Sequence, residues 1–451
     1  MQVQIHETKL IQPATPPLPD QEPVLPLSHL DTDPNLDITF RYLRVYVNAD
    51  QTKRAHDTPY HVIARALSGA LCYYYPLCGT LRPGDNDHHR LELHCVAGQG
   101  MPLVHATANC TLHAVKNLDD ADSGFLEQLI PNPDPEESLA NPCMLQVTVF
   151  ECGGFSLGTA IHHTMCDGLG ATLFFGAAAE LARGAERVSI EPVWDRAVLL
   201  GPRSPARIEA LVGDYLCEKG RNPYDDEENC KFGREFFHVK EEWLDRFKAL
   251  MLEKCGQKFT TFEALGAFIW RAKVKVSDIP GDETVKFSYS TNIRKVLKPP
   301  LPVGYWGNGC VPIYVQLTAR DLLEKPIWEV AELIRKSKRN ASDEYVRSYI
   351  DFQEAHRREG VSAGKNVSGF TDWRHLGHSA VDFGWGGPAN VLPLSRKLLG
   401  SNEACFFLPC SEVGVRDPSD GFRVLVNLKD RCLCSFKEEM EKLGKMEFGF
   451  A

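Results

Sequence analysis

The stretch Gly158-Thr159-Ala160-Ile161-His162-His163-Thr164-Met165-Cys166-Asp167-Gly168 joins two apolar segments. The run Phe155 to Ile161 is strand-like, and residues 169–182 are apolar and rich in alanine, which predicts a buried helix. His163 therefore stands where the strand ends. There an imidazole can project into a cleft and titrate near neutral pH. Asp167, four residues later and beside a glycine turn, can hold the imidazole or the loop in place.

Three interpretations compete for this stretch. In the first, the histidines are core residues and Asp167 caps the helix that follows. In the second, His162, His163 and Asp167 bind a metal ion, but adjacent histidines on a strand point to opposite faces and do not readily share one ion. In the third, His163 is a general base. The residues alone disfavour the metal site and leave the other two open.

A competing motif overlaps the same stretch. Gly154-Phe155-Ser156-Leu157-Gly158 fits the nucleophile elbow of serine hydrolases. That elbow needs a helix directly after the serine, whereas Leu157 to Ile161 continues as a strand. A hydrolase that uses Ser156 is therefore disfavoured.

The composition excludes several classes of protein. The chain has 451 residues, 43% of them hydrophobic, and a formal net charge of −10. This charge argues against nucleic acid or an anionic membrane as the main partner. No apolar run approaches the roughly 20 residues that span a bilayer, and the N-terminus does not resemble a signal peptide. The 15 cysteines stand singly without a metal-binding cluster, so we expect a cytoplasmic protein with reduced thiols and no metal.

The order of predicted elements indicates an α/β fold in two lobes. We expect one lobe over residues 1–190, a crossover linker over 191–225, and a second lobe over 226–451. A segment near 380–402 is expected to pack back on the first lobe. No glycine-rich phosphate loop follows any strand, which argues against a dinucleotide or nucleotide enzyme. The predicted strands are 39–47, 90–96, 144–151, 155–161, 234–238, 284–291 and 311–317, and the predicted helices are 60–73, 169–182, 241–254, 261–274 and 326–339.

A second distinctive stretch lies more than two hundred residues beyond the first. Asp382-Phe383-Gly384-Trp385-Gly386-Gly387-Pro388 places aromatic residues between glycines, which is typical of a tight loop. Together with the histidine stretch, it resembles the H-x-x-x-D and D-F-G-W-G motifs of the plant BAHD acyltransferases. Cys78, Thr80 and Trp306 depart from the commoner residues of that family. The further segments that resemble the family are Leu27–Asp31, Tyr74–Leu81, Gln146–Phe155, Thr260–Leu265, Asn292–Pro302 and Gly304–Asn308.

The resemblance implies two similar lobes like those of chloramphenicol acetyltransferase, each with a mixed sheet, and a tunnel between them. It implies acyl transfer from a CoA thioester to a hydroxyl in a ternary complex, with His163 as general base. An amine acceptor is the alternative, and a non-catalytic binding protein is less favoured. Acyl-CoA is then a co-substrate, with no permanently bound cofactor. We expect a monomer whose partners are acyl-CoA and a small alcohol or amine, and no membrane or nucleic acid.

The resemblance also assigns roles to other residues at the site. It implies that Asp167 orients the loop by pairing with an arginine, and we expect Asp382 to pair with Arg294. Thr371 and Trp373 resemble a T-x-W segment that approaches the tetrahedral intermediate, where a hydroxyl and an indole N–H can stabilise the oxyanion. Ordinary packing of a tryptophan near the cleft explains the same segment equally well.

The CoA phosphates need hydrogen-bond donors, and a predicted helix start is one source of them. Four residues cluster there: Lys254, Lys258, Thr260 and Thr261. The backbone N–H groups at a helix N-terminus together with nearby lysines suit phosphate, although solvated surface charge explains the same cluster equally well.

Overall fold

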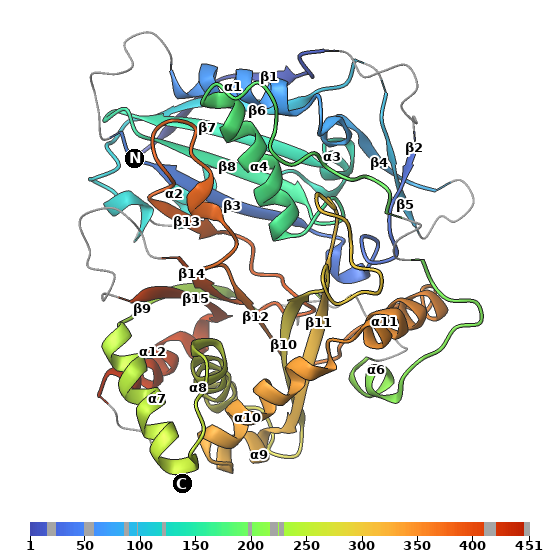
Figure 1. Ribbon diagram of the computed structural model, residues 1–451. Coiled ribbons are helices and arrows are strands. Elements are labelled where there is room, and N and C mark those ends of the chain that lie inside the picture. Colours follow the sequence, from blue (N-terminus) through green and yellow to red (C-terminus); the bar gives the residue numbers. More distant parts are fainter. Residues whose placement is uncertain are drawn as a thin grey trace.

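The chain folds into two lobes, each built around a six-stranded sheet (Figure 1). The computed structural model describes residues 1–15, 24–48, 58–84, 90–96, 98–119, 123–196, 201–216, 224, 230–409 and 421–445. This arrangement confirms the predicted α/β fold class.

The sheet of the first lobe has the strand order β1-β6-β7-β8-β3-β13. Only β6 and β7 run parallel, and the other neighbours are antiparallel. Its strands are β1 Val3–Ile11, β3 Thr39–Tyr46, β6 Met101–Ala108, β7 Cys143–Phe150, β8 Phe155–His162 and β13 Asn390–Pro393. A small separate sheet contains β2 Val24–Pro26, β4 Thr80–Pro83 and β5 Leu91–His94.

The sheet of the second lobe has the order β11-β10-β12-β14-β15-β9. Strand β12 runs parallel to both of its neighbours, so this sheet is also mixed. Its strands are β9 Phe232–Val239, β10 Thr284–Asn292, β11 Cys310–Thr318, β12 Val367–Asp372, β14 Cys405–Leu408 and β15 Phe422–Lys429.

Helices cover the sheets in both lobes (Figure 1). The first lobe contains α1 Pro59–Ala70, α2 Ser123–Glu127, α3 Pro135–Ala140 and α4 Gly168–Ala182. The second contains α7 Glu241–Cys255, α8 Thr261–Val276, α9 Ala319–Glu324, α10 Ile327–Ser337, α11 Asp343–Ala355 and α12 Asp430–Lys445, and α6 Ala210–Tyr215 contributes Val212 to the core of this lobe. In the part of the chain that the structure describes, no helix combines the length and apolar character needed to cross a bilayer.

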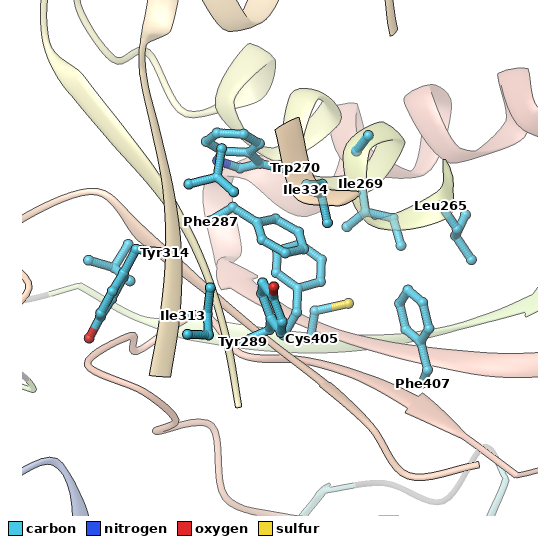
Figure 2. Close-up of a cluster of buried hydrophobic side chains, with 14 of the residues drawn as sticks. Leu265, Ile269, Trp270, Phe287, Tyr289, Ile313, Tyr314, Ile334, Cys405 and Phe407 are labelled. Atoms are coloured by element: carbon cyan, nitrogen blue, oxygen red, sulfur yellow. The ribbon is translucent and has the colours of Figure 1, made fainter. Parts of the chain in front are cut away.

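Helix α8 forms the centre of the second lobe's core (Figure 2). Its residues Leu265, Ile269 and Trp270 are fully buried. They pack near Phe287 of β10, whose ring stacks on Phe370 of β12 at 4.1 Å between centroids. Apolar area removed from water stabilises such a cluster by about 25 cal/mol per Å².

A strand from the late part of the chain completes the sheet of the first lobe. β13 lies late in the chain, yet it pairs with β3 of the first sheet, with Val391 opposite Arg44. The chain therefore returns to the first lobe after β12 and re-enters the second sheet with β14. This return brings the segment after β12 alongside β3, where the candidate site lies.

Candidate functional site

His163 is the first residue after β8, and backbone contacts to two distant segments hold it. Its N–H donates to the carbonyl of Ile38 at 2.9 Å. Its carbonyl accepts from Nδ2 of Asn308 at 2.9 Å, and the same amide nitrogen donates to Asp31 at 2.9 Å. Asp31 is fully buried. The backbone of His163 is thus fixed by residues from both lobes.

The imidazole of His163 is half-buried in a largely apolar setting. The ring of Phe40 meets it edge-on, with the centroids 5.9 Å apart. Burial lowers the pKa of His163, and its own backbone carbonyl, Asp167 and Asn308 oppose this change only in part. The ring is therefore neutral at pH 7 and able to accept a proton.

Asp167 caps α4 and pairs with an arginine of the second lobe. Its Oδ1 accepts from the N–H of Gly170 at 2.8 Å. Arg294 donates to Oδ2 at 2.7 Å and to Oδ1 at 3.0 Å, a bidentate pair, and Gly309 N–H donates to Oδ2 at 2.9 Å. Burial raises the pKa of Asp167, but Arg294 and the backbone donors outweigh it, so the pKa falls below its usual value. The carboxylate is therefore charged and serves to position the loop.

The expected pairing of Asp382 with Arg294 was wrong. Arg294 forms its ion pair with Asp167 instead. The Oδ1 atom of Asp382 accepts from the N–H groups of Gly384 at 2.6 Å and Gly386 at 2.8 Å. These two glycines have φ values of 99° and 86°, in the left-handed region that side chains rarely adopt. Asp382 therefore organises its own loop.

A cavity of about 470 Å³ lies in front of His163 and receives residues from both lobes. His163, Asp167, Thr371 and Trp373 all line it, whereas Asp382 does not. Its lining residues come from β3, β8 and the start of α4 in the first lobe and from β10, β11 and β12 in the second. The structure thus brings four of the predicted site residues to one cavity.

Thr371 and Trp373 enter the cavity from β12 and the turn after it. Trp373 is 7% exposed, and its ring lies 5.8 Å from the rings of both Phe40 and Tyr42. The backbone N–H of Trp373 donates to the carbonyl of Phe407 at 2.8 Å, which fixes the backbone beside β14. The indole is therefore held firmly in the cavity wall.

The four residues expected to bind CoA phosphates lie where α7 ends and α8 begins: Lys254 is in the last turn of α7, Lys258 and Thr260 stand between the helices, and Thr261 is the first residue of α8. None of them lines the cavity, but Phe262, the next residue in α8, does. Thr260 caps the helix through a capping box in which its hydroxyl accepts from Glu263 N–H and its N–H donates to the Glu263 carboxylate. Lys254 and Lys258 are exposed. The lysines are thus free to meet solvent, while two of the backbone donors at this helix start are already used.

Sequence reasoning missed two parts of the site. Lys338 lines the cavity and pairs with Glu263 at 2.5 Å, but nothing in its local sequence distinguishes it from other surface lysines. Arg196 is 2% exposed and donates to the carbonyls of Met165 and Trp306, with a 3.5 Å contact to Asp31. A lone arginine in the region of the linker gave no signal of this role.

The structure also decides the role of Ser156. The residue lies inside β8, opposite Val45 of β3, and is fully buried. The next helix, α4, begins only at Gly168, twelve positions after the serine. Ser156 is therefore not a nucleophile at an elbow.

Comparisons with known proteins agree with this architecture. A family model described as "Transferase: Transferase family" matches residues 1–443. The chain is 33% identical to spermidine sinapoyl-CoA acyltransferase of Arabidopsis thaliana, over 97% of this chain and 96% of that one. It is 30% identical to taxadien-5-alpha-ol O-acetyltransferase of Taxus chinensis, over 99% of this chain and 98% of that one.

Solved structures match across the length of the chain. The crystal structure of vinorine synthase has a TM-score of 0.75 and 20% identity, and covers 98% of both chains. The F. sporotrichioides TRI101 complex with coenzyme A and T-2 has a TM-score of 0.71 and 16% identity, over 93% of this chain and 97% of that one. At such identities, the match establishes the two-lobed fold.

Proposed function

Because the chain belongs to the Transferase family, that of the plant BAHD acyltransferases, we propose that it moves an acyl group from a CoA thioester to the hydroxyl of a small molecule. One observation carries this proposal. His163, a neutral imidazole, faces a cavity that both lobes line. The cavity can hold a thioester and an alcohol together, which lowers the entropic barrier to their reaction.

His163 acts as the general base in this reaction. It removes the proton of the acceptor hydroxyl as the oxygen attacks the thioester carbonyl, and then returns the proton to the departing thiolate. The lowered pKa of His163 keeps the ring unprotonated before the attack. Asp167 takes no proton, because Arg294 and the backbone donors hold its carboxylate in the charged form.

Thr371 and Trp373 are proposed to stabilise the oxyanion of the tetrahedral intermediate. Both line the cavity that His163 faces, and a hydroxyl and an indole N–H are suitable donors. One such donor is worth about 3 kcal/mol in other enzymes. We also infer that the exposed Lys254 and Lys258, with Thr260 and Thr261, hold the phosphates of CoA near Phe262 at the cavity wall.

The transfer is proposed to be direct, without an acyl-enzyme. The thiol closest in sequence to His163 is Cys166, which is 3% exposed. Burial raises the pKa of Cys166 well above its usual range, so the thiolate that would attack an acyl group is scarce. Both substrates are therefore expected to bind before the acyl group moves.

An amine acceptor is the alternative to the hydroxyl. One relative is named as an acyltransferase of spermidine, which is an amine. The taxadienol relative, in contrast, is named as an O-acetyltransferase. The same base serves both reactions, because the nitrogen also loses a proton as it attacks. We further expect a cytosolic monomer, which size-exclusion chromatography and cell fractionation can check.

The test is a panel of acyl-CoAs against alcohols and amines, read by mass spectrometry. The wild-type protein should give esters with at least one alcohol, and His163→Ala should lower kcat by about 100- to 10,000-fold while its melting temperature is retained. Amides without esters would favour the alternative. A His163→Ala variant with more than a tenth of the wild-type activity would refute the assignment of the base.

A further inference from the structure

A fully buried arginine lies behind the cavity wall without a carboxylate partner. Arg44 of β3 is 0% exposed, and among the described residues no carboxylate forms an ion pair with it. Its guanidinium donates to the hydroxyl of Tyr42 at 3.2 Å and to Nδ1 of His378 at 3.3 Å. It also lies 4.3 Å from the ring centre of Phe175. A buried cation with so little compensation is costly, so its one imidazole contact needs an explanation.

This contact determines the tautomer of His378. An arginine can only donate hydrogen bonds, so Nδ1 of His378 must accept, and the ring proton must lie on Nε2. Burial lowers the pKa of His378 well below its ordinary value, and the nearby charge of Arg44 acts in the same direction. The ring is therefore neutral and presents a single N–H donor.

That donor has no hydrogen-bond partner among the residues that the structure describes. Nε2 of His378 is buried there, and the residue as a whole is only 3% exposed. Leaving a buried donor unsatisfied costs free energy, and such groups in native proteins call for a specific reason.

His378 lines the cavity, and aromatic rings surround it there. Its ring lies 5.0 Å from Trp373 and 6.2 Å from Tyr42, measured between centroids. Phe40 lies between Trp373 and His163, at 5.8 Å and 5.9 Å from their rings. His378 thus belongs to an aromatic part of the cavity wall, and ring contacts through Trp373 and Phe40 connect it to His163.

We propose that His378 determines substrate specificity: its Nε2–H donates to an oxygen carried on an aromatic group of a substrate, and Arg44 positions it by fixing the tautomer. This inference rests on the proposed acyl transfer, and it names the substrate class. Planar aromatic walls favour a flat ring, and the single donor selects a phenol or aryl ether oxygen on it. The positive charge of Arg44 disfavours a cationic amine at this position. The ring oxygen belongs either to the acyl donor or to the acceptor.

Two matched substrate pairs separate these sources. On the donor side, cinnamoyl-CoA is compared with 4-hydroxycinnamoyl-CoA at one fixed alcohol. On the acceptor side, benzyl alcohol is compared with 4-hydroxybenzyl alcohol at one fixed acyl-CoA. The measured quantity is the ratio of kcat/KM for the oxygenated member to that for the plain member. One hydrogen bond predicts a wild-type ratio near tenfold in one of the two pairs, and that pair identifies the substrate.

Variants of His378 test the donor itself. His378→Leu should reduce the ratio to about one. His378→Gln, which can accept from Arg44 and still donate, should keep most of it. His375→Gln is the matched control, because this histidine of the same loop also lines the cavity but is exposed, and the ratio should stay near the wild-type value. If His378→Leu does not fold, His378→Phe replaces it.

Arg44→Met tests the positioning role, since it removes the charge and keeps a long apolar side chain. The ratio should fall because Nδ1 is then free to carry the proton. A merely structural role would lower the melting temperature and both kcat/KM values together and leave the ratio unchanged.

Calorimetry separates this inference from the proposed function. Each thioester and each alcohol is titrated alone into wild-type protein and into His378→Leu. A tenfold difference in Kd that the variant loses supports the donor even if no acyl transfer is observed. A wild-type protein without preference in either pair, or ratios within twofold of wild type in His378→Leu, would overturn the assignment.

Discussion

Replacing Asp167 by Asn should destabilise the protein far more than the same change at Asp382. The two oxygens of Asp167 accept five hydrogen bonds: two from Arg294 and one each from the N–H of Gly170, the N–H of Gly309 and the thiol of Cys310. An asparagine there keeps the helix cap, since Asn and Asp cap equally well. The amide nitrogen of asparagine, however, cannot accept hydrogen bonds, yet it would face donors whose hydrogen bonds the carboxylate accepts. The substitution therefore isolates the cost of breaking the ion pair.

The expected loss of stability follows from the burial of the Asp167–Arg294 pair. The side chains of Asp167 and Arg294 are 6% and 13% exposed, so the pair is shielded from solvent. Removing one member of a buried pair costs about 3–5 kcal/mol because the other charge remains buried. If one lobe of roughly 200 residues unfolds as a unit, the melting temperature falls by about 6–20 °C. Activity should fall about 100-fold, because the loop that carries His163 loses its anchor.

Asp382→Asn is the matched control. Both recorded hydrogen bonds to the carboxyl group of Asp382 end on one oxygen, and an asparagine retains such an oxygen. The expected loss is at most about 1 kcal/mol. Thermal unfolding of both variants, followed by circular dichroism, makes the comparison.

A double-mutant cycle completes the assay. Asp167→Asn and Arg294→Met should show a coupling free energy of about 1–3 kcal/mol. Equal losses for Asp167→Asn and Asp382→Asn, or additive effects in the cycle, would show that the pair is not the anchor.

Three further outcomes are expected. Because the pKa of His163 is lowered, kcat/KM should rise with pH through a midpoint below 6.5 and stay level from pH 7 to 8, and a midpoint above 7 in the pH profile would contradict this. Cys166→Ser should stay active, and initial-rate plots should intersect; parallel lines, or a mass shift of one acyl group after incubation with acyl-CoA alone, would indicate an acyl-enzyme. Lys254→Ala and Lys258→Ala should each raise the KM for acyl-CoA by up to about fivefold and leave the KM for the acceptor unchanged. Lys442→Ala on α12 is the control. Equal changes in both KM values would exclude phosphate binding by Lys254 and Lys258.

The sequence predicted several elements in which one face or one run is clearly apolar, but it missed the mostly buried strands β6 and β15. The strand predicted at 39–47 is β3, Thr39–Tyr46, and the helix predicted at 261–274 is α8, Thr261–Val276. Strand β1 was not predicted, because it lies at a sheet edge and exposes most of its residues, so it has no alternating pattern. Strand β14 has only four residues, Cys405–Leu408, and gives too short a signal.

The partner of Arg294 could not be chosen from the sequence. Two aspartates, 167 and 382, were both available, and both lie far from it in the chain. The choice depends on where the end of β10 lies in three dimensions. Gly309 stands just before β11, the neighbour of β10, and its N–H contacts the same Asp167 oxygen as Arg294. Both donors thus approach the start of α4 from one edge of the second sheet.

The same geometry explains why the segments Leu27–Asp31 and Gly304–Asn308 belong to the site, although neither supplies a reactive group. Asp31 accepts from the N–H and the side-chain amide of Asn308, and that amide also donates to the carbonyl of His163. Arg294 and Gly309 belong to the second lobe, as Asn308 does, and both donate hydrogen bonds to Asp167. The loop between β8 and α4 is therefore fastened at both ends to the second lobe. Since the hydrogen bonds that hold this loop come from both lobes, the position of His163 depends on how the two lobes are docked, as does the cavity that they line together.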